Sequence, residues 1–296
     1  MGFLTTPFAW IMRSFYNLTG NYVISIFLFT LLFRLIMLPF SIKQQTASAK
    51  MARIQPKIKR IQEKYATNRV KMNEEMQKLY QKENYNPASL SGCLPSIIQL
   101  LLIFPLIDVI YKPITHIIGL GSDTINSLIE KLGISTNERG FELLIFGKPI
   151  EDIKAAAGAE VADKIASFNN TFLGINISDK PEFKHISWLW LIPILACLLQ
   201  LAVSYVSLRQ QKASGQAGAG SAGCMLYGMS IFSLFLCFGF PAGMGVYWIS
   251  SSLIMLIQQL LMNKFYGPGK IAAKLMVDET LERREKENAI KQKVSQ

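Results

Sequence analysis

Histidine and cysteine are scarce in this chain of 296 residues, which has two of the former and four of the latter. Both histidines, His116 and His185, lie outside its long apolar stretches. The cysteines lie in or beside those stretches: Cys93, Cys197, Cys224 and Cys237. No spacing indicates a disulfide framework or a metal site, and no Ser/His arrangement or paired intramembrane Asp indicates a hydrolase. We therefore expect no catalytic residues, no cofactor and no enzyme activity.

Charge is also scarce, because charged residues make up only 17% of the chain while 50% are hydrophobic. The mean hydropathy is +0.27, which is typical of an integral membrane protein. A hydrocarbon core about 30 Å thick needs about 20 mainly apolar residues as a helix. Five continuous runs approach this length, and they lack the polar/apolar alternation of membrane strands. The predicted spans are residues 22–42, 92–112, 186–208, 224–241 and 242–263. The predicted fold is an all-α polytopic membrane protein.

The distribution of Lys and Arg predicts the orientation, because basic loops stay on the cytoplasmic side. Residues 43–91 carry eleven basic and four acidic residues, so we place them in the cytoplasm. Residues 113–185 carry seven basic and ten acidic residues, so we place them outside. The Gly-rich loop 209–223 and the basic tail 264–296 are then cytoplasmic. The N-terminus is expected outside and the C-terminus inside.

Residues 1–21 are predicted to form an amphipathic helix on the outer membrane surface. Thr6 and Pro7 suit the N-cap and first helical position, and apolar residues then recur at helical spacing. These residues are Phe8, Ile11, Met12 and Phe15.

Residues 43–91 are predicted to form a cytoplasmic helical hairpin with a turn at 66–68. Each arm has one apolar stripe at helical spacing. The stripes are Ile54, Ile58, Ile61 and Tyr65 in the first arm, and Met72, Met76 and Leu79 in the second. Two interpretations stay open and are compatible: the arms pack on each other with a solvated basic face, or the hairpin is a basic paddle that contacts lipid head groups, incoming chains or a ribosome.

Arg34 lies in the middle of the first predicted span, which has no other charge between Val23 and Phe40. A guanidinium at this depth costs roughly 2.5–3.5 kcal/mol on insertion scales, so it should face water, protein or a substrate. Asp108 is four residues before Lys112 near the outer end of the second span and should pair with it locally. Arg34 is then left without an acidic partner, which favours a water-filled cavity over a buried ion pair.

Polar residues in all five spans are candidates to line such a cavity. For any one of them the simpler interpretation is a bridge between neighbouring helices that contributes about 1 kcal/mol or less. The candidates are Thr30 in the first span, Ser96 and Gln99 in the second, Gln200, Ser204 and Ser207 in the third, Ser230 and Ser233 in the fourth, and Ser250, Ser251, Ser252, Gln258 and Gln259 in the fifth.

Short motifs distributed from about residue 8 to 266 resemble those of the YidC/Oxa/Alb membrane protein insertases. In chain order they are Arg34-Leu35-Ile36-Met37-Leu38-Pro39, Lys50-Met51, Gln55-Pro56-Lys57-Ile58, Asn86-Pro87, Gly92-Cys93-Leu94-Pro95, Ile98-Gln99, Phe172-Leu173-Gly174, Pro241-Ala242-Gly243, Tyr247-Trp248-Ile249 and Ile257-Gln258-Gln259. Their order and spacing together make the resemblance specific.

This resemblance implies a five-helix core around a hydrophilic groove that is open to the cytoplasm and to lipid but closed outside. Arg34 would be its positive centre. The groove candidates are Arg34, Gln200, Trp248, Thr30, Gln99, Ser204 and Ser251. The resemblance further implies a bacterial plasma membrane location, nascent membrane proteins as substrates, and the Sec translocon, ribosomes and membrane lipids as partners. Two departures stand out: residues 113–185 contain what looks like an insertion, and Ser252 stands where several relatives have Asn.

An anion channel or transporter is the alternative function, because Arg34 in a water-filled pathway would also bind an anion. Against it, no inverted repeat and no pair of Gly/Pro-broken helices is evident in the sequence. Ion flux through the purified protein would favour this alternative.

Overall fold

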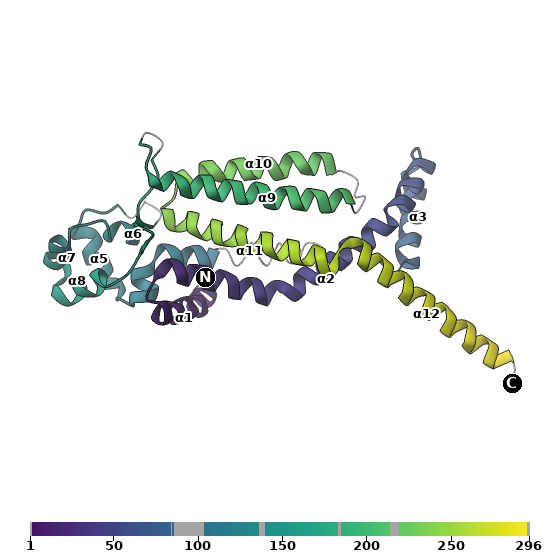
Figure 1. Ribbon diagram of the computed structural model, residues 1–296, viewed down its shortest axis with the longest axis horizontal. Helices are drawn as coiled ribbons and strands as arrows, with labels where there is room; N and C mark the ends of the chain where they lie inside the picture. The colour runs from purple at the N-terminus through teal and green to yellow at the C-terminus, as the bar shows by residue number, and fades with distance from the viewer. Residues whose placement is uncertain are drawn as a thin grey trace. The chain divides into compact units, whose positions relative to one another are not determined.

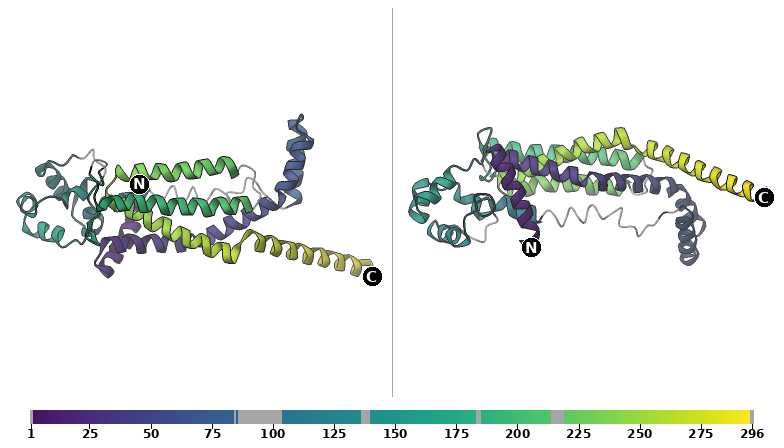
Figure 2. Two further views of the ribbon diagram at one scale, coloured as in Figure 1. Left: turned by 45° about the horizontal axis from the view of Figure 1, so that its top comes forward. Right: turned by 90° about the horizontal axis from the view of Figure 1, so that it is seen from below.

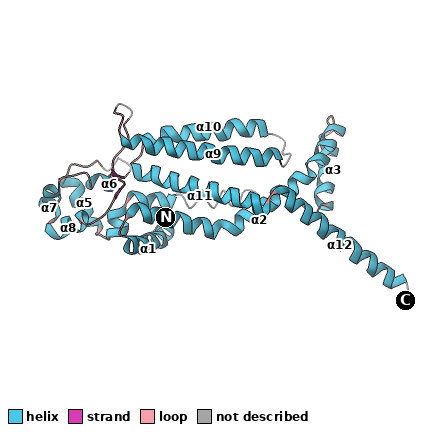
Figure 3. Ribbon diagram, viewed as in Figure 1, coloured by secondary structure: helices cyan, strands magenta, loops and turns pink. Residues whose placement is uncertain are grey.

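A computed structural model of the chain describes residues 2–83, 85, 104–135, 140–182, 185–213 and 219–294. The described residues are predominantly helical, with one pair of two-residue strands (Figure 3). Three helices among them are long and apolar enough to cross a membrane: Tyr22–Lys64, Trp188–Lys212 and Ala242–Tyr266. Most of the second predicted span lies outside the described residues, and the fourth falls largely within α10 (Ala219–Phe238).

The chain divides into two compact units. The first comprises residues 1–36, 96–204 and 224–256, and the second comprises residues 37–95, 205–223 and 257–296. Four long helices contribute to both units: α2 (Tyr22–Lys64), α9 (Leu191–Ala213), α10 and α11 (Ala242–Tyr266).

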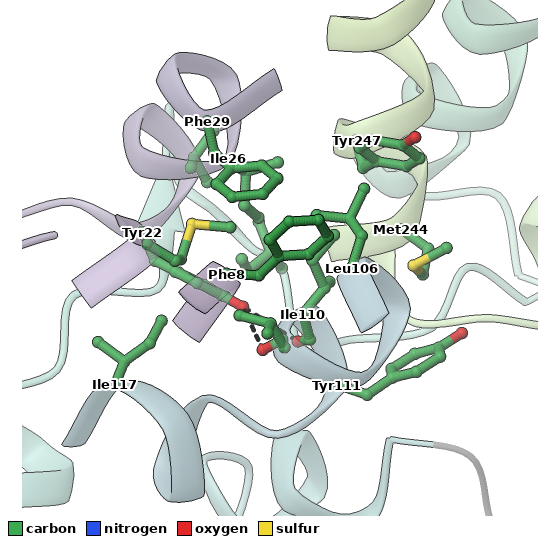
Figure 4. Close-up of a cluster of buried hydrophobic side chains, with 14 of the residues drawn as sticks. Phe8, Tyr22, Ile26, Phe29, Leu106, Ile110, Tyr111, Ile117, Met244 and Tyr247 are labelled. Atoms are coloured by element: carbon green, nitrogen blue, oxygen red, sulfur yellow. Dashed lines mark hydrogen bonds between the residues drawn. The ribbon is translucent and has the colours of Figure 1, made fainter. Parts of the chain in front are cut away.

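In the first unit, the apolar stripe of α1 (Gly2–Thr19) packs against the hydrophobic cluster of this unit. Met12 is fully buried, and the Phe8 ring makes edge-on contacts with Phe29 and Phe33 at centroid distances of 5.4 and 5.8 Å. Figure 4 shows Phe8 among side chains that come from α2, the helix at residues 104–111 and α11. The opposite face of α1 exposes Trp10, which is 70% accessible.

The same unit contains α9, α10 and α11 side by side (Figure 1, Figure 2). Gly245 allows α9 and α11 to approach closely, because a Cβ atom at this position would lie 2.2 Å from Cγ2 of Ile192. Small residues at such crossings let membrane helices gain van der Waals contact that larger side chains would prevent. The glycine therefore sets the distance between these two helices.

Residues 114–179 form a helical module with its own hydrophobic cluster, which includes Leu128, Ile145 and Ile153. Its elements are η1 (Ile114–Ile118), α5 (Ser122–Lys131), α6 (Phe141–Ile145), α7 (Ile150–Ala157), α8 (Ala159–Ala166), β1 (Thr171–Phe172) and β2 (Ile175–Asn176). The Ala-rich stretch at residues 155–159 lies within the segment that looked like an insertion. It forms the end of α7, the start of α8 and the sharp turn, or corner, between them. Gly158 makes this corner with a φ of 90°, which other residues rarely adopt.

The module covers the beginnings of two membrane helices. The backbone N–H of Tyr22, at the start of α2, donates to the carbonyl of Asn169 at 3.0 Å. Ala242 and Gly243, at the start of α11, donate to the carbonyls of Asp179 and Ile177 at 2.9 and 2.8 Å. Helix starts leave such N–H groups without intrahelical partners, so these bonds fix the module to the bundle.

Glu142 is a buried carboxylate inside the module, with only 1% of its surface exposed. It accepts hydrogen bonds from the backbone N–H of Thr115 at 2.9 Å and from the Thr115 hydroxyl. Burial raises the pKa of Glu142, and these hydrogen bonds only partly oppose the rise. Folding therefore favours the protonated form of this side chain.

We expect this carboxyl to make the protein less stable as pH rises. Because its folded pKa is raised, its favourable contribution is complete below the ordinary Glu pKa of about 4.3 and is lost as pH rises through the raised value. In thermal unfolding of the purified protein between pH 4 and 7, Glu142→Gln should flatten the fall in Tm with pH. Glu151→Gln, at an exposed position of α7, should leave that slope unchanged. An equal slope in all three proteins would contradict the assignment.

In the second unit, α2 continues without a break beyond the predicted end of the first span and reaches Lys64. A turn then leads to α3 (Arg69–Lys82), whose N-cap Asn68 accepts from the backbone N–H of Lys71. Ile54 and Ile58 of the predicted first-arm stripe are 2% and 3% exposed. The first arm of the hairpin is thus a continuation of the membrane helix α2.

Glu83 closes the end of this hairpin opposite the turn. Its carboxylate accepts hydrogen bonds from Arg53 at 2.8 Å and from Lys57, both on α2. The side chain of Glu83 is 9% exposed, so these charge-assisted bonds are partly shielded from water. The two bonds lower the pKa of Glu83, Lys57 contributing first.

We expect Glu83→Gln to loosen α3 from α2, with amide hydrogen exchange in α3 about five- to tenfold faster at neutral pH. Since the folded pKa is lowered, the stabilisation is present above the ordinary Glu pKa of about 4.3 and is lost as pH falls through the lowered value. Acidification should therefore reproduce the variant in the wild-type protein. Glu63→Gln, at an exposed position of α2, is the matched control; equal acceleration in both variants would sink the idea.

The junction between α11 and α12 (Pro268–Val294) is a Gly-Pro break in the second unit. Pro268 has no N–H to donate to the carbonyl of Lys264, and the side chain of Lys270 donates to it instead at 2.7 Å. The side chain of Gln45 donates to the carbonyl of Tyr266 at 3.0 Å. These side chains satisfy carbonyls that the helix end leaves without partners.

Candidate functional site

Arg34 on α2 reaches the facing helix α11 in the first unit. Its Nη2 atom donates to the hydroxyl of Ser251 at 2.8 Å and lies 3.8 Å from the Sδ atom of Met255. The hydroxyl of Tyr247, one turn before Ser251, interacts with the Ser251 hydroxyl. Residues 247, 251 and 255 repeat every four positions, so all three lie on the face of α11 that meets Arg34.

The guanidinium has no acidic partner within the described part of the chain. Asp108 pairs instead with Lys112 at 2.8 Å, as the sequence predicted, and with His116 at 3.1 Å. A guanidinium carries five N–H donors, yet only Nη2 has partners among the described residues. Within the described part of the chain, Nε and Nη1 thus have no hydrogen-bond partner.

Gln200, a second groove candidate, lies on α9 and contacts a different face of α11. The hydroxyl of Ser252 donates to its Oε1 atom at 3.1 Å. Ser252 is 6% exposed, so this bond lies within the helix interface. Ser252 thus provides a polar contact between the third and fifth predicted spans.

The second unit holds two more hydrogen bonds between the same two helices. Gln259 donates to the hydroxyl of Ser207 at 3.0 Å, and Gln210 donates to Asn263. Ser207 and Gln259 are separated by 52 residues, as Gln200 and Ser252 are, and such a constant offset is expected for parallel helices. These bonds match the simpler interpretation of bridges between neighbouring helices.

Ser204 and Thr30 use their hydroxyls away from Arg34. Ser204 shares a 3.0 Å hydrogen bond with Ser230 of α10, and both side chains are almost fully buried. Thr30 donates to the carbonyl of Ile26 in its own helix at 2.7 Å. The structure thus brings neither hydroxyl into contact with the guanidinium.

Trp248 packs its ring against Phe240 at a centroid distance of 6.0 Å and borders the cluster of Figure 4. Gln99 and Ser96 lie outside the described residues. Of the six groove candidates within the described residues, only Arg34 and Ser251 are joined by a hydrogen bond.

Sequence reasoning missed Tyr247 and Met255 as neighbours of Arg34. The signal that could have identified them is their spacing of four residues on either side of Ser251, which places all three on one face of a helix. Met and Tyr are common in membrane helices, so composition does not single them out. The described residues contain no group of three or more His, Cys, Asp or Glu that could hold a metal ion. The described side chains around Arg34 offer hydrogen bonding and electrostatic attraction.

Comparison with known proteins adds independent information. Residues 14–269 match the family described as 60Kd inner membrane protein. A protein of Treponema denticola named membrane protein insertase YidC is 32% identical over 254 residues, covering 86% of this chain and 36% of that relative. Its namesake from Rickettsia felis is 28% identical over 263 residues, covering 88% of this chain and 39% of that relative.

The chain thus spans between a third and two fifths of the length of these curated relatives. The matched region includes α2 with Arg34 and all of α9, α10 and α11. Its long apolar helices agree with a location in a membrane. The chain is an all-α polytopic membrane protein that belongs to the 60Kd inner membrane protein family, the YidC group of membrane proteins.

Proposed function

We propose that this protein is a membrane protein insertase and chaperone, in which Arg34 is the cationic centre of a hydrophilic groove. The observation that carries the proposal is the guanidinium of Arg34, which lies in a membrane helix beside Ser251 without an acidic partner among the described residues. The name of the relatives, membrane protein insertase YidC, supports the same function. Nascent membrane proteins are the proposed substrates.

Insertion by such a site needs no bond chemistry. The polar tail of a substrate must cross about 30 Å of hydrocarbon, and a hydrated groove that reaches part of the way shortens this path. The positive charge of Arg34 attracts acidic groups of the tail, while the apolar segment of the substrate leaves sideways into lipid. Burial of that segment, at about 0.8 kcal/mol per CH₂ group, supplies the driving force.

Ser251 is the resting partner of Arg34 in this scheme. Its neutral hydroxyl holds the guanidinium at 2.8 Å, yet a carboxylate forms a stronger, charge-assisted bond and displaces it. The remaining groove candidates are Gln200, Trp248, Thr30, Gln99 and Ser204. Their role in the proposed groove is to keep the neighbouring helix faces polar or to shape its wall.

The proposed topology places residues 114–179 outside the cell and the α2–α3 hairpin with α12 in the cytoplasm. The proposed partners on the cytoplasmic side are ribosomes, through the basic hairpin and tail, and lipid head groups. The Sec translocon is the proposed partner within the membrane. The bonds from the module to the starts of α2 and α11 support a groove that is closed outside.

A reconstitution experiment tests this function. Liposomes with the purified chain should insert a small single-span protein with a short acidic tail several-fold more efficiently than protein-free liposomes, and the same vesicles should show no chloride flux above background. Equal insertion with and without the chain would reject the proposal. Chloride flux that depends on Arg34 would favour the anion channel or transporter.

A further inference from the structure

The β1–β2 hairpin turns through Leu173 and Gly174, which have φ angles of 52° and 78°. Two central residues with positive φ make the tight turn that suits strand twist, and Asn-Gly is the preferred sequence there. Leu173 is the only residue other than glycine with positive φ in the described part of the chain. A bulky side chain in this region is strained, so the leucine is unfavourable for the turn itself.

The leucine gains nothing from packing that would offset this strain. It is 87% exposed, and the adjacent Phe172 is 40% exposed. Two large apolar side chains thus stand at the tip of a hairpin whose other residues are held by polar contacts. Strained residues cluster at functional sites, and no packing within the described residues accounts for the conformation of this one.

The hairpin is fixed where the membrane helices begin. The side chain of Asn21, just before α2, donates to the carbonyl of Thr171 at 2.9 Å, and Ile177 accepts from the first turn of α11. Just before α9, Ile186 and Trp188 are 87% and 78% exposed. Helix ends in a polytopic protein mark the boundary between hydrocarbon and head groups, where aromatic and apolar anchors concentrate.

We propose that the hairpin tip formed by Phe172 and Leu173 inserts into the head-group boundary of the bilayer and anchors the module to lipid. Two side chains are too few for a stable protein interface, which buries about 800 Å² on each partner, whereas a few apolar groups suffice for a bilayer surface. The inference requires only that the chain spans a membrane and is independent of the insertase function.

Fluorescence quenching tests this contact in the full chain reconstituted in liposomes, with the four native cysteines replaced by alanine. An environment-sensitive label is attached at Leu173→Cys or, as a matched exposed site on α7, at Glu151→Cys. Lipids that carry a quencher near the head group should quench the label at position 173 at least threefold more than that at 151. Aqueous iodide should show the opposite order.

Equal iodide quenching at positions 173 and 151 would overturn the proposal. A label at position 173 that neither the lipid quencher nor iodide reaches would also overturn it, because such shielding indicates a contact with protein. A second variant separates anchoring from folding of the hairpin. Leu173→Asn suits the turn conformation but removes the apolar side chain. With the label at Phe172→Cys, this change should reduce lipid quenching at least twofold, and unchanged quenching would exclude a role for Leu173.

Discussion

Arg34→Ala is expected to reduce insertion of a substrate with a short acidic tail about tenfold or more, while Arg34→Lys retains most of the activity. The reason is the position of the charge, because Arg34 lies in a membrane helix and contacts Ser251 and Met255. No other cation among the described residues contacts these two side chains. Lysine keeps the positive charge but loses the fork of donors, so it should attract the tail and hold it less firmly. The measurement is the yield of inserted substrate at equal abundance of each variant.

Arg209→Ala is the matched control, because it removes an exposed arginine from the end of α9. It should insert substrate like the wild type. Thermal unfolding of each variant separates a loss of function from a loss of fold. If Arg34→Ala inserts as well as wild type, the guanidinium is only structural, and hydration or thinning of the membrane becomes the mechanism to test.

Phe168→Ala is expected to have the largest effect on stability, lowering the free energy of unfolding by about 3–5 kcal/mol. Phe168 is 6% exposed and follows α8 at the edge of the module. Its ring contacts Tyr16 of α1 at a centroid distance of 4.7 Å, Phe146 at 5.0 Å and Tyr22 of α2 at 5.2 Å. Removing it leaves a cavity where α1, α2 and the module meet.

The same substitution at Phe265, which is 61% exposed, is the control and should change stability little. Unfolding is followed by denaturant titration in detergent, together with hydrogen exchange in α1 and the module. Exchange in both segments should accelerate in Phe168→Ala. A variant as stable as wild type would contradict the view that this ring joins the three segments.

Features that depend on composition, on runs of apolar residues or on the spacing of nearby residues were predictable from the sequence. Composition and long apolar runs predicted the all-α membrane fold, and an uncompensated charge within one run singled out Arg34. The local pairing of Asp108 with Lys112 was also predictable, because residues four apart on a helix are neighbours. Each of these inferences depends on residues close together in the chain.

Contacts between distant helices were not predictable in the same way. The hydroxyls of Ser251 and Ser252 are adjacent in sequence, yet one faces Arg34 and the other Gln200, because successive helical positions point about 100° apart. Which face meets which helix depends on packing, and close approach at Gly245 contributes to it. The sequence alone assigns no partner to either serine.

The module was unpredictable for a different reason. Its helices α6, α7 and α8 have five to eight residues, too few for a clear periodic pattern, and are stabilised by packing around a shared core. The apolar stripe of α1 was recognised, but its partner was not. A stripe of this kind suits a membrane surface and a protein surface equally well, so the sequence does not reveal that Phe8 and Met12 pack into the cluster of the first unit.

The most direct test of the cationic groove is a double-mutant cycle between Arg34 and the acidic residues of a substrate tail. Insertion is measured for acidic and neutralised tails with wild type and with Arg34→Gln, so that each single change and the pair are known. We predict a coupling of about 1–2 kcal/mol, which means that neutralising the tail lowers insertion about five- to thirtyfold with wild type but has little effect with Arg34→Gln. Equal losses with both proteins would contradict direct attraction between Arg34 and the tail.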